Sequence, residues 1–310
     1  MLRFVAKRLL SGAITIWFIA TATFFAMHAV PGDPLSDEMA VNPEIRRNLE
    51  IRYGFDKPLM TQYAVFMGNI LRGDFGISFT QQNRRVNDII RAHFPVSAIL
   101  GVLALLIAAI GGVVWGALTA RYRERWPDYV ITLLVMLAIS VPSFVFAALA
   151  QWLVVGLNAW AGHTVLPVAG WGSPAHMVMP ALVLGLGTMA YITRLTRSSM
   201  LEVASQDFMT TARAKGLSET RVFFRHQLRN ALLPVVTILG PAVAAITTGG
   251  FVVELIFAIP GLGRYFVQAV QQLDYTVIMG TTVFYGAFLV IMVLLVDLLY
   301  GLLDPRIRLR

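Results

Sequence analysis

Cysteine is absent from the 310 residues of this chain, and charged residues make up only 14% of them. Without cysteine there can be no disulfide bond and no thiolate metal site. A soluble domain carries about 25% charged residues. The shortage of charge, with 57% hydrophobic residues and a mean hydropathy of +0.70, therefore predicts a membrane protein. We interpret the net charge of +8 as a signal of topology, and we expect no nucleic acid as a partner.

Enzymatic and nucleotide-binding motifs are also missing. No Gly-x4-Gly-Lys-Ser/Thr stretch occurs, so the sequence has no P-loop to hold ATP phosphates. The five histidines are scattered and form no set with metal-ligand spacing. We therefore expect no catalytic residue, no metal site and no cofactor in this chain. If ATP drives its function, another chain must bind the ATP.

Six apolar runs predict an all-α membrane protein with six transmembrane helices, each needing about 20 residues to cross the hydrocarbon core. The runs cover approximately residues 9–30, 96–120, 129–155, 177–192, 235–257 and 277–303. No small-residue cleavage site follows the first run, so we interpret it as a retained span rather than a signal peptide. Pro142 and Pro241 should kink their spans, and Pro180 should lie in the first turn of its own.

Residues 31–95 form a large polar insert between the first two spans, in which eight acidic residues balance eight basic ones. Pro31-Gly32-Asp33-Pro34 should end the first span, because proline lacks a backbone donor and Gly-Asp favours a turn. Stretches 42–53 and 58–71 predict short helices, and 84–93 predicts an amphipathic piece. The insert could dock a soluble binding protein or cap the bundle. The predicted organisation is thus residues 1–30, the insert 31–95 and a core of 96–310.

The distribution of charge predicts the topology. The N-terminus, the loop between spans 2 and 3, the loop between spans 4 and 5 and the C-terminal tail hold sixteen basic and six acidic residues. The short loops on the other face hold one of each, Arg264 and Asp274. Because positive loops face the cytoplasm, both termini should be cytoplasmic and the insert 31–95 should lie outside.

One long polar segment, residues 206–234, interrupts the apolar runs. Asp207 can cap a short helix that Gly216 ends in a left-handed turn, and Ser218 can cap a second helix ending before Pro234. The basic residues on that second helix repeat every four positions and share one side; they are Arg221, Arg225 and Arg229. The apolar residues around its opposite side are Phe223, Phe224 and Ala231. This predicts a helix–turn–helix with one apolar side and one basic side. Such a surface could dock a soluble partner, or its charge could contact anionic membrane lipid.

Few ionisable residues lie within the predicted spans. Glu254 falls near the outer end of span 5, and Asp297 falls in the inner half of span 6. A carboxylate at the bilayer centre costs about 2.5–3.5 kcal/mol, so neither should face lipid. Glu254 could line a central path and meet a substrate amine, or it could form an interhelical hydrogen bond. Asp297 is a second candidate for the path, with a structural partner across helices as the alternative.

The polar segment carries a family resemblance. Thr211-Ala212-Arg213-Ala214-Lys215-Gly216-Leu217, followed by Leu228-Arg229-Asn230-Ala231-Leu232-Leu233-Pro234, resembles the ATPase-coupling loop of ABC-importer permeases of the peptide/nickel branch. In the wider family the pattern is Glu-Ala-Ala, three residues and Gly; here Ala212 and Gly216 match, whereas Thr210 and Thr211 replace the Glu and the first Ala. Pro31–Pro34, Gly73–Phe79 and Pro260–Gly263 extend the resemblance over essentially the whole chain, to B-type permease subunits of oligopeptide importers.

The resemblance implies a type I ABC-importer permease of the bacterial inner membrane, with residues 194–234 as its cytoplasmic coupling loop. A homologous second permease, two ATPase subunits that bind ATP and Mg²⁺, and an extracytoplasmic peptide-binding protein would be its partners. The implied coupling residues are Asp207, Thr210, Thr211, Ala212, Arg213, Ala214, Lys215, Gly216 and Leu217. Dipeptides, glutathione and nickel complexes are alternative substrates to oligopeptides. An ion-coupled secondary carrier is the alternative from another class, although such carriers usually have more spans and inverted repeats.

Overall fold

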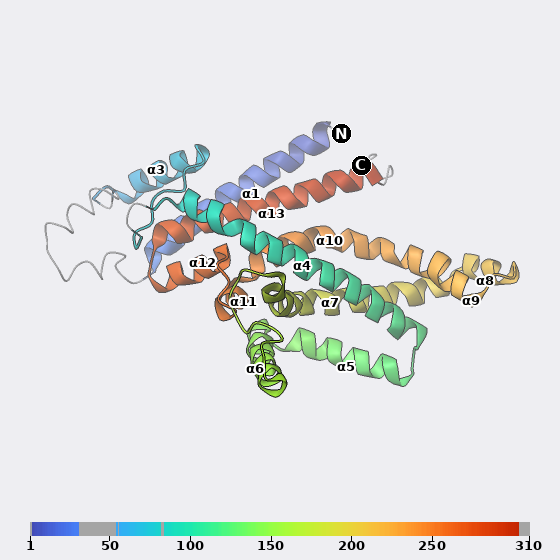
Figure 1. The fold of residues 1–310 in the computed structure, drawn as a ribbon. Helices are drawn as coiled ribbons and strands as arrows, with labels where there is room; N and C mark the ends of the chain where they lie inside the picture. The colour runs from blue at the N-terminus through green and yellow to red at the C-terminus, as the bar shows by residue number, and fades with distance from the viewer. Residues whose placement is uncertain (1, 31–53, 55, 82–83, 304–310) are drawn as a thin grey trace. The chain divides into compact units, whose positions relative to one another are not determined.

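A computed structural model describes residues 2–30, 54, 56–81 and 84–303, and every named element in these ranges is a helix. The chain divides into two compact units, Met1–Val96 with Pro260–Arg310, and Ser97–Ile259. Helix α4 (Val86–Arg121) runs from the first unit into the second (Figure 1). It therefore crosses the boundary predicted between residues 95 and 96, and the predicted three-part organisation stays a prediction.

Five helices in the described ranges are long and apolar enough to cross a membrane. They are Ala6–Ala29 within α1 (Leu2–Ala29), α4, α6 (Ser143–Ala161), α7 (Pro174–Ala204) and Tyr275–Leu295 within α13 (Tyr275–Leu303). The predicted span 235–257 is divided at Gly250 between α10 (Arg229–Gly249) and α11 (Phe251–Ile256). The all-helical membrane fold is confirmed, and the number of six spans stays a prediction.

Helices α1 and α13 lie side by side in the first unit (Figure 1). Glycines allow this close approach, because a Cβ atom on Gly12 would lie 2.6 Å from the Val290 side chain. A Cβ atom on Gly286 would similarly lie 2.8 Å from the Ile19 side chain. Small residues at such crossings let apolar helices pack closely in lipid. Close packing matters there because the hydrophobic effect contributes little to helix association.

The polar insert is partly described. Helix α3 (Leu59–Leu71) agrees with the helix predicted over 58–71 and packs its Tyr63 against Phe24 of α1. Residues 42–53, where another helix is predicted, lie outside the described residues. The predicted piece 84–93 is no separate element, because α4 begins at Val86 and continues through Pro95. Within the same unit, Asp274 is buried and accepts hydrogen bonds from the Ser78 and Thr80 hydroxyls, which ties the turn after α3 to the start of α13.

Helices α4 and α7 form the centre of the second unit. A Cβ atom on Gly116 of α4 would lie 2.5 Å from Thr196 Cβ of α7. A Cβ atom on Gly185 of α7 would lie 2.7 Å from the Ala104 carbonyl oxygen of α4. The two backbones therefore approach each other at glycine positions along several turns. Helix α7 extends well beyond the predicted span 177–192, and Pro180 is its seventh residue rather than part of its first turn.

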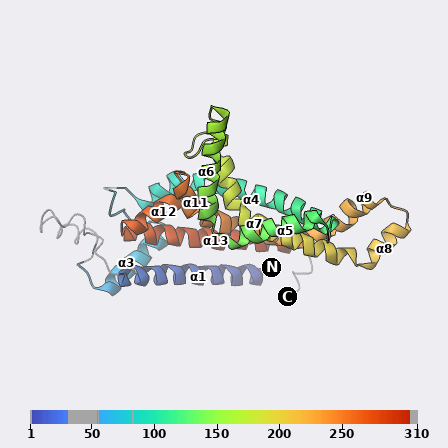
Figure 2. The ribbon, with the colours of Figure 1, turned by 90° about the horizontal axis from the view of Figure 1, so that it is seen from below.

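A full break replaces the kink predicted at Pro142. Helix α5 (Trp126–Ser140) ends before Val141, whose φ of −93° and ψ of 128° are extended, and α6 begins at Ser143. Proline disfavours the helical conformation of the residue before it, which explains the extended Val141. Figure 2 shows α6 turned steeply away from α5. The predicted span 129–155 is thus two helices that point in different directions.

Candidate functional site

The polar segment forms a short helix beyond the end of α7, followed by a tight turn and a return helix (Figure 1). The short helix α8 spans Asp207–Ala214, so the predicted first helix is confirmed. Its N-cap is Gln206, and no side chain caps it. The prediction that Asp207 caps the helix is therefore wrong by one position. Asp207 still places a negative charge in the first turn, where the helix dipole favours it.

The turn after α8 is a Schellman motif closed by Gly216, as the sequence predicts. The Gly216 N–H donates to the Arg213 carbonyl at 2.9 Å, and the Leu217 N–H donates to the Ala212 carbonyl at 3.4 Å. This is the pair of bonds that ends helices at a left-handed residue. Gly216 has a φ of 74°, which a side chain disfavours even though a Cβ atom there would meet nothing within 4 Å. The glycine is required by backbone conformation and not by lack of space.

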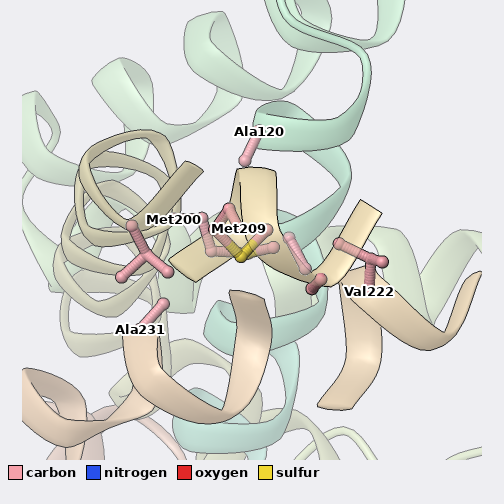
Figure 3. Packing of buried hydrophobic residues seen from close by; sticks show 8 residues of the cluster. Ala120, Met200, Met209, Val222 and Ala231 are labelled. Carbon is pink, nitrogen blue, oxygen red and sulfur yellow. The ribbon is translucent and has the colours of Figure 1, made fainter. Parts of the chain in front are cut away.

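The inner face of α8 is held in an apolar cluster that joins the ends of several helices (Figure 3). From α8, Met209 is fully buried and Ala212 is nearly so. The other buried members are Ala117 and Ala120 of α4, Met200 and Val203 of α7, Val222 and Ala231. Burying a methionine side chain contributes roughly 1.5–3 kcal/mol. Helix α8 is consequently packed rigidly against the ends of α4, α7 and α10.

The outer face of α8 is open. Of the nine predicted coupling residues, Ala212 is buried and Leu217 is half-buried. The other seven are exposed: Asp207, Thr210, Thr211, Arg213, Ala214, Lys215 and Gly216. Arg213 forms a 3.0 Å ion pair with Glu219 across the turn, but both side chains are exposed, and such pairs contribute only about 0–1 kcal/mol. The structure therefore separates the predicted residues into a packed inner set and an accessible outer set.

The second helix differs from its prediction. It starts as α9 (Glu219–Arg221), continues as the π-helix η1 (Val222–Leu228) and passes into α10 through Pro234. Ser218 occupies the N-cap position, but its side chain makes no capping bond. The prediction that the helix ends before Pro234 is wrong. Proline removes one backbone hydrogen bond, and the buried neighbours Ala231 and Val235 hold the helix together around it.

The basic side of this helix is present as predicted. Arg221, Arg225 and Arg229 are all exposed, and Val222 and Ala231 are buried on the other side. Phe224, predicted on the apolar side, is instead 59% exposed. The π-helix explains this difference, because each of its hydrogen bonds spans five residues and rotates the side chains relative to an α-helix. Such single-turn π segments are frequent at functional sites.

A buried ion pair near this surface has no counterpart in the sequence predictions. Arg197 of α7 contacts Asp128 of α5 through two hydrogen bonds, Nε to Oδ1 at 3.0 Å and an Nη to Oδ2 at 2.8 Å. The carboxylate also accepts a bond from the Glu124 N–H at 3.0 Å. The two partners are 69 positions apart and belong to no recognisable motif. The only signal in the sequence is the placement of both residues at the polar ends of apolar runs.

The two candidate path residues, Glu254 and Asp297, belong to different compact units of the chain. Glu254 lies on α11 and is 3% exposed, so it would need a change in packing to reach a substrate. Asp297 lies on α13, but its side chain is outside the described set. Their role in a path stays a prediction. In the described ranges no group of three or more histidine or acidic residues could hold a metal ion.

The chain matches known transport proteins over most of its length. Residues 112–309 match the family described as binding-protein-dependent transport system inner membrane component, and residues 1–101 match its N-terminal counterpart. The chain is 49% identical over 310 residues to the dipeptide transport system permease protein DppB of Bacillus subtilis (strain 168), covering 100% of this chain and 99% of the relative. It is 40% identical to the oligopeptide transport system permease protein OppB of Haemophilus influenzae, covering 99% of this chain and 100% of the relative. One solved structure is described as an amino acid ABC transporter with histidines. The match covers 71% of this chain and 94% of that structure's chain, with 16% sequence identity and a TM-score of 0.49.

Proposed function

This chain belongs to the family of inner membrane components of binding-protein-dependent transport systems, and on that premise we propose that it is the permease subunit of an ATP-driven peptide importer. Its helices would provide half of a translocation path. Separate ATPase subunits would supply the energy, because the sequence contains no P-loop of its own. An extracytoplasmic binding protein would deliver the substrate, and a homologous second permease would complete the path.

The observation that carries this proposal is the two-sided packing of α8. Its inner face, with Met209 and Ala212, is buried in the cluster that joins α4, α7 and α10. Its outer face, with Thr210 and Thr211, is open to a partner. A helix seated in an ATPase cleft by its outer face would pass the movement of that cleft to the membrane helices through its inner face. The two hydrogen bonds at Gly216 end α8 and turn the chain back toward the membrane helices.

The substrate of the proposed importer is a peptide. Relatives that match the whole chain are named for dipeptide and for oligopeptide transport, so we propose short peptides as the class. Glutathione and nickel complexes are the alternatives within the same class of importer. The binding protein would make most of the selection, and its ligand would identify the natural substrate.

The proposed orientation places the termini and α8 in the cytoplasm and residues 31–95 outside. Exposed basic residues support it, because Arg213, Lys215, Arg221, Arg225 and Arg229 gather around α8 and the return helix. Positively charged segments are retained on the cytoplasmic side of the inner membrane. The same side is where ATPase subunits would find ATP and Mg²⁺.

The decisive experiment compares two threonine-to-arginine variants in the assembled transporter. Thr210→Arg introduces a long charged side chain on the open face of α8, and Thr164→Arg makes the same change at an exposed position between α6 and α7. We expect Thr210→Arg to abolish peptide uptake and peptide-stimulated ATP hydrolysis while the chain remains in the membrane. Thr164→Arg should leave both activities near the parental level. Normal coupling in Thr210→Arg would refute the role of α8, and uptake that persists without any ATPase subunit would favour a secondary carrier.

A cysteine-free chain also allows a direct test of contact. A single cysteine at Thr210 would be the only thiol in the permease, so a crosslink to an ATPase subunit would report on this position alone. Efficient crosslinking from residue 210 and none from residue 164 is the expected result. Equal crosslinking from both positions would contradict docking at α8.

A further inference from the structure

A groove lies between α5 and α7, and no residue of α8 lines it. It has a volume of about 860 Å³, within the range of about 300–1,000 Å³ that is usual for small-molecule sites. Residues of α5 and α7 line most of it, and Thr119 of α4 completes it. All of these residues belong to the second compact unit. The groove is thus a feature of a single folded unit.

Charged and apolar side chains are separated along the groove. Asp128, Arg194 and Arg197 contribute all its formal charge, and Leu133 and Met136 line the part that lies further along α5. At 1.5 Å per residue, about 12 Å of helix separates Asp128 from Met136. Leu133 and Met136 are 58% and 59% exposed, so their apolar surface is available. The groove therefore suits an elongated molecule that is polar at one end and apolar along its length.

The charge at the polar end is positive. Arg197 donates two hydrogen bonds to Asp128, and the charges of these two side chains neutralise each other. Arg194, which is exposed, forms no ion pair with any described residue. One guanidinium charge thus remains uncompensated in the groove. An anionic group is the complement that this end would bind, and arginine favours phosphate because its planar group can donate two bonds at once.

Aromatic residues independently place this end at the surface of the membrane. Trp126 and Tyr129, at the start of α5, are 76% and 65% exposed, and Tyr122 in the preceding turn is 37% exposed. Exposed tryptophan and tyrosine rings gather at the level of lipid headgroups, where one end of the ring is apolar and the other is wet. The charged end of the groove lies at the same end of α5. The apolar part then extends toward the hydrocarbon core.

We propose that the groove between α5 and α7 is a binding site for an anionic phospholipid. Arg194 holds the phosphate, and one acyl chain lies along Leu133 and Met136. Basic pockets between transmembrane helices are known sites for acidic headgroups. A helix of a second permease subunit is the competing occupant. It is less favoured because it would have to supply a carboxylate opposite Arg194 at the level of the headgroups.

The test is native mass spectrometry of the full chain in detergent with dioleoyl phosphatidylglycerol or the zwitterionic dioleoyl phosphatidylcholine as probe. Phosphatidylglycerol should be retained preferentially by the parental chain. Arg194→Gln should weaken this retention about fivefold, the effect of losing one basic residue near a charged headgroup, and Arg194→Lys should preserve most of it. Arg72→Gln removes an exposed arginine at the end of α3, outside the groove, and serves as the matched control, with retention unchanged. Lipid binding is measured without transport, so its outcome is independent of the proposed importer function.

Four results would overturn the proposal. Equal retention of the two lipids would show that the groove does not recognise charge, and equal losses in Arg194→Gln and Arg72→Gln would show a general electrostatic effect. Displacement of phosphatidylglycerol by soluble glycerol phosphate would identify a site for a free anion. Retention by the isolated chain that disappears when the complete transporter is assembled would show that a partner subunit covers the groove.

Discussion

Arg197 and Asp128 join α7 to α5 through two parallel hydrogen bonds of 3.0 and 2.8 Å, with the carboxylate almost fully buried and the guanidinium about one-third exposed. Two-point pairing of this kind fixes the distance and the rotation between the two helices. The pair lies at the end of α7 that leads into α8. It therefore connects the region around α8 to the start of α5.

Removal of the carboxylate should destabilise this helix pair. We expect Asp128→Asn to lower the free energy of unfolding by about 1.5–3 kcal/mol, the usual contribution of hydrogen bonds to charged groups. Thermal unfolding of the purified chain in detergent measures the change. Glu124→Gln, which removes the carboxylate of an exposed ion pair with Arg123, is the matched control and should change stability by less than about 1 kcal/mol. Equal effects of the two substitutions would show that the Arg197–Asp128 pair contributes no more to stability than the exposed Arg123–Glu124 pair.

Two glycine-to-alanine substitutions should change the free energy of unfolding in opposite directions. Gly216→Ala places a side chain at a φ of 74°, which costs about 1–2 kcal/mol. Gly156→Ala adds a methyl group in α6, where nothing lies within 4 Å, and should stabilise the helix by about 0.5–1 kcal/mol. Unfolding curves of Gly216→Ala and Gly156→Ala test this prediction. A neutral Gly216→Ala would mean that the turn relaxes into another conformation.

Met209, the buried residue of α8, should contribute more to the free energy of unfolding than its exposed neighbour Phe208. Met209→Ala removes a fully buried side chain and should lower the free energy of unfolding by about 2–5 kcal/mol. Phe208→Ala truncates a residue that is 38% exposed, so its loss should be smaller. Stability in detergent is the primary measurement, with peptide uptake as the second. A larger effect of Phe208→Ala would place the important contact of α8 on its outer side.

The close crossing of α4 and α7 should tolerate no added volume. In Gly116→Val the new Cβ atom would lie 2.5 Å from Thr196 Cβ and 2.6 Å from the Thr193 carbonyl oxygen. Because a backbone atom cannot move aside as a flexible side chain can, we expect a loss of about 1–3 kcal/mol or more. Gly187→Val on α7, where nothing lies within 4 Å, is the control for the same change in side chain. Membrane levels and thermal unfolding of both variants would check this, and similar values would contradict the close packing.

Local sequence signals predicted the turn at Gly216 and the helix of residues 58–71 well. In both places the signal is short-range, since a glycine after a helix and an apolar run between turns act within a few residues. The predictions failed where packing competes with local preference. Pro234 is passed by α10 although proline usually ends a helix, and Phe224 faces outward because η1 changes the rotation of the helix.

The shortage of charge and the long apolar runs determined from the sequence alone that the chain is an all-helical membrane protein, because a helix needs about 20 apolar residues to cross the hydrocarbon core. The motif around Gly216, together with the stretches Pro31–Pro34, Gly73–Phe79 and Pro260–Gly263, also predicted the family from the sequence. Only the tertiary structure decided that Met209 and Ala212 face inward while Thr210 and Thr211 face outward, and that Arg197 finds Asp128. These relations depend on which helix ends meet in space, and residues 69 positions apart carry no local signal of their contact.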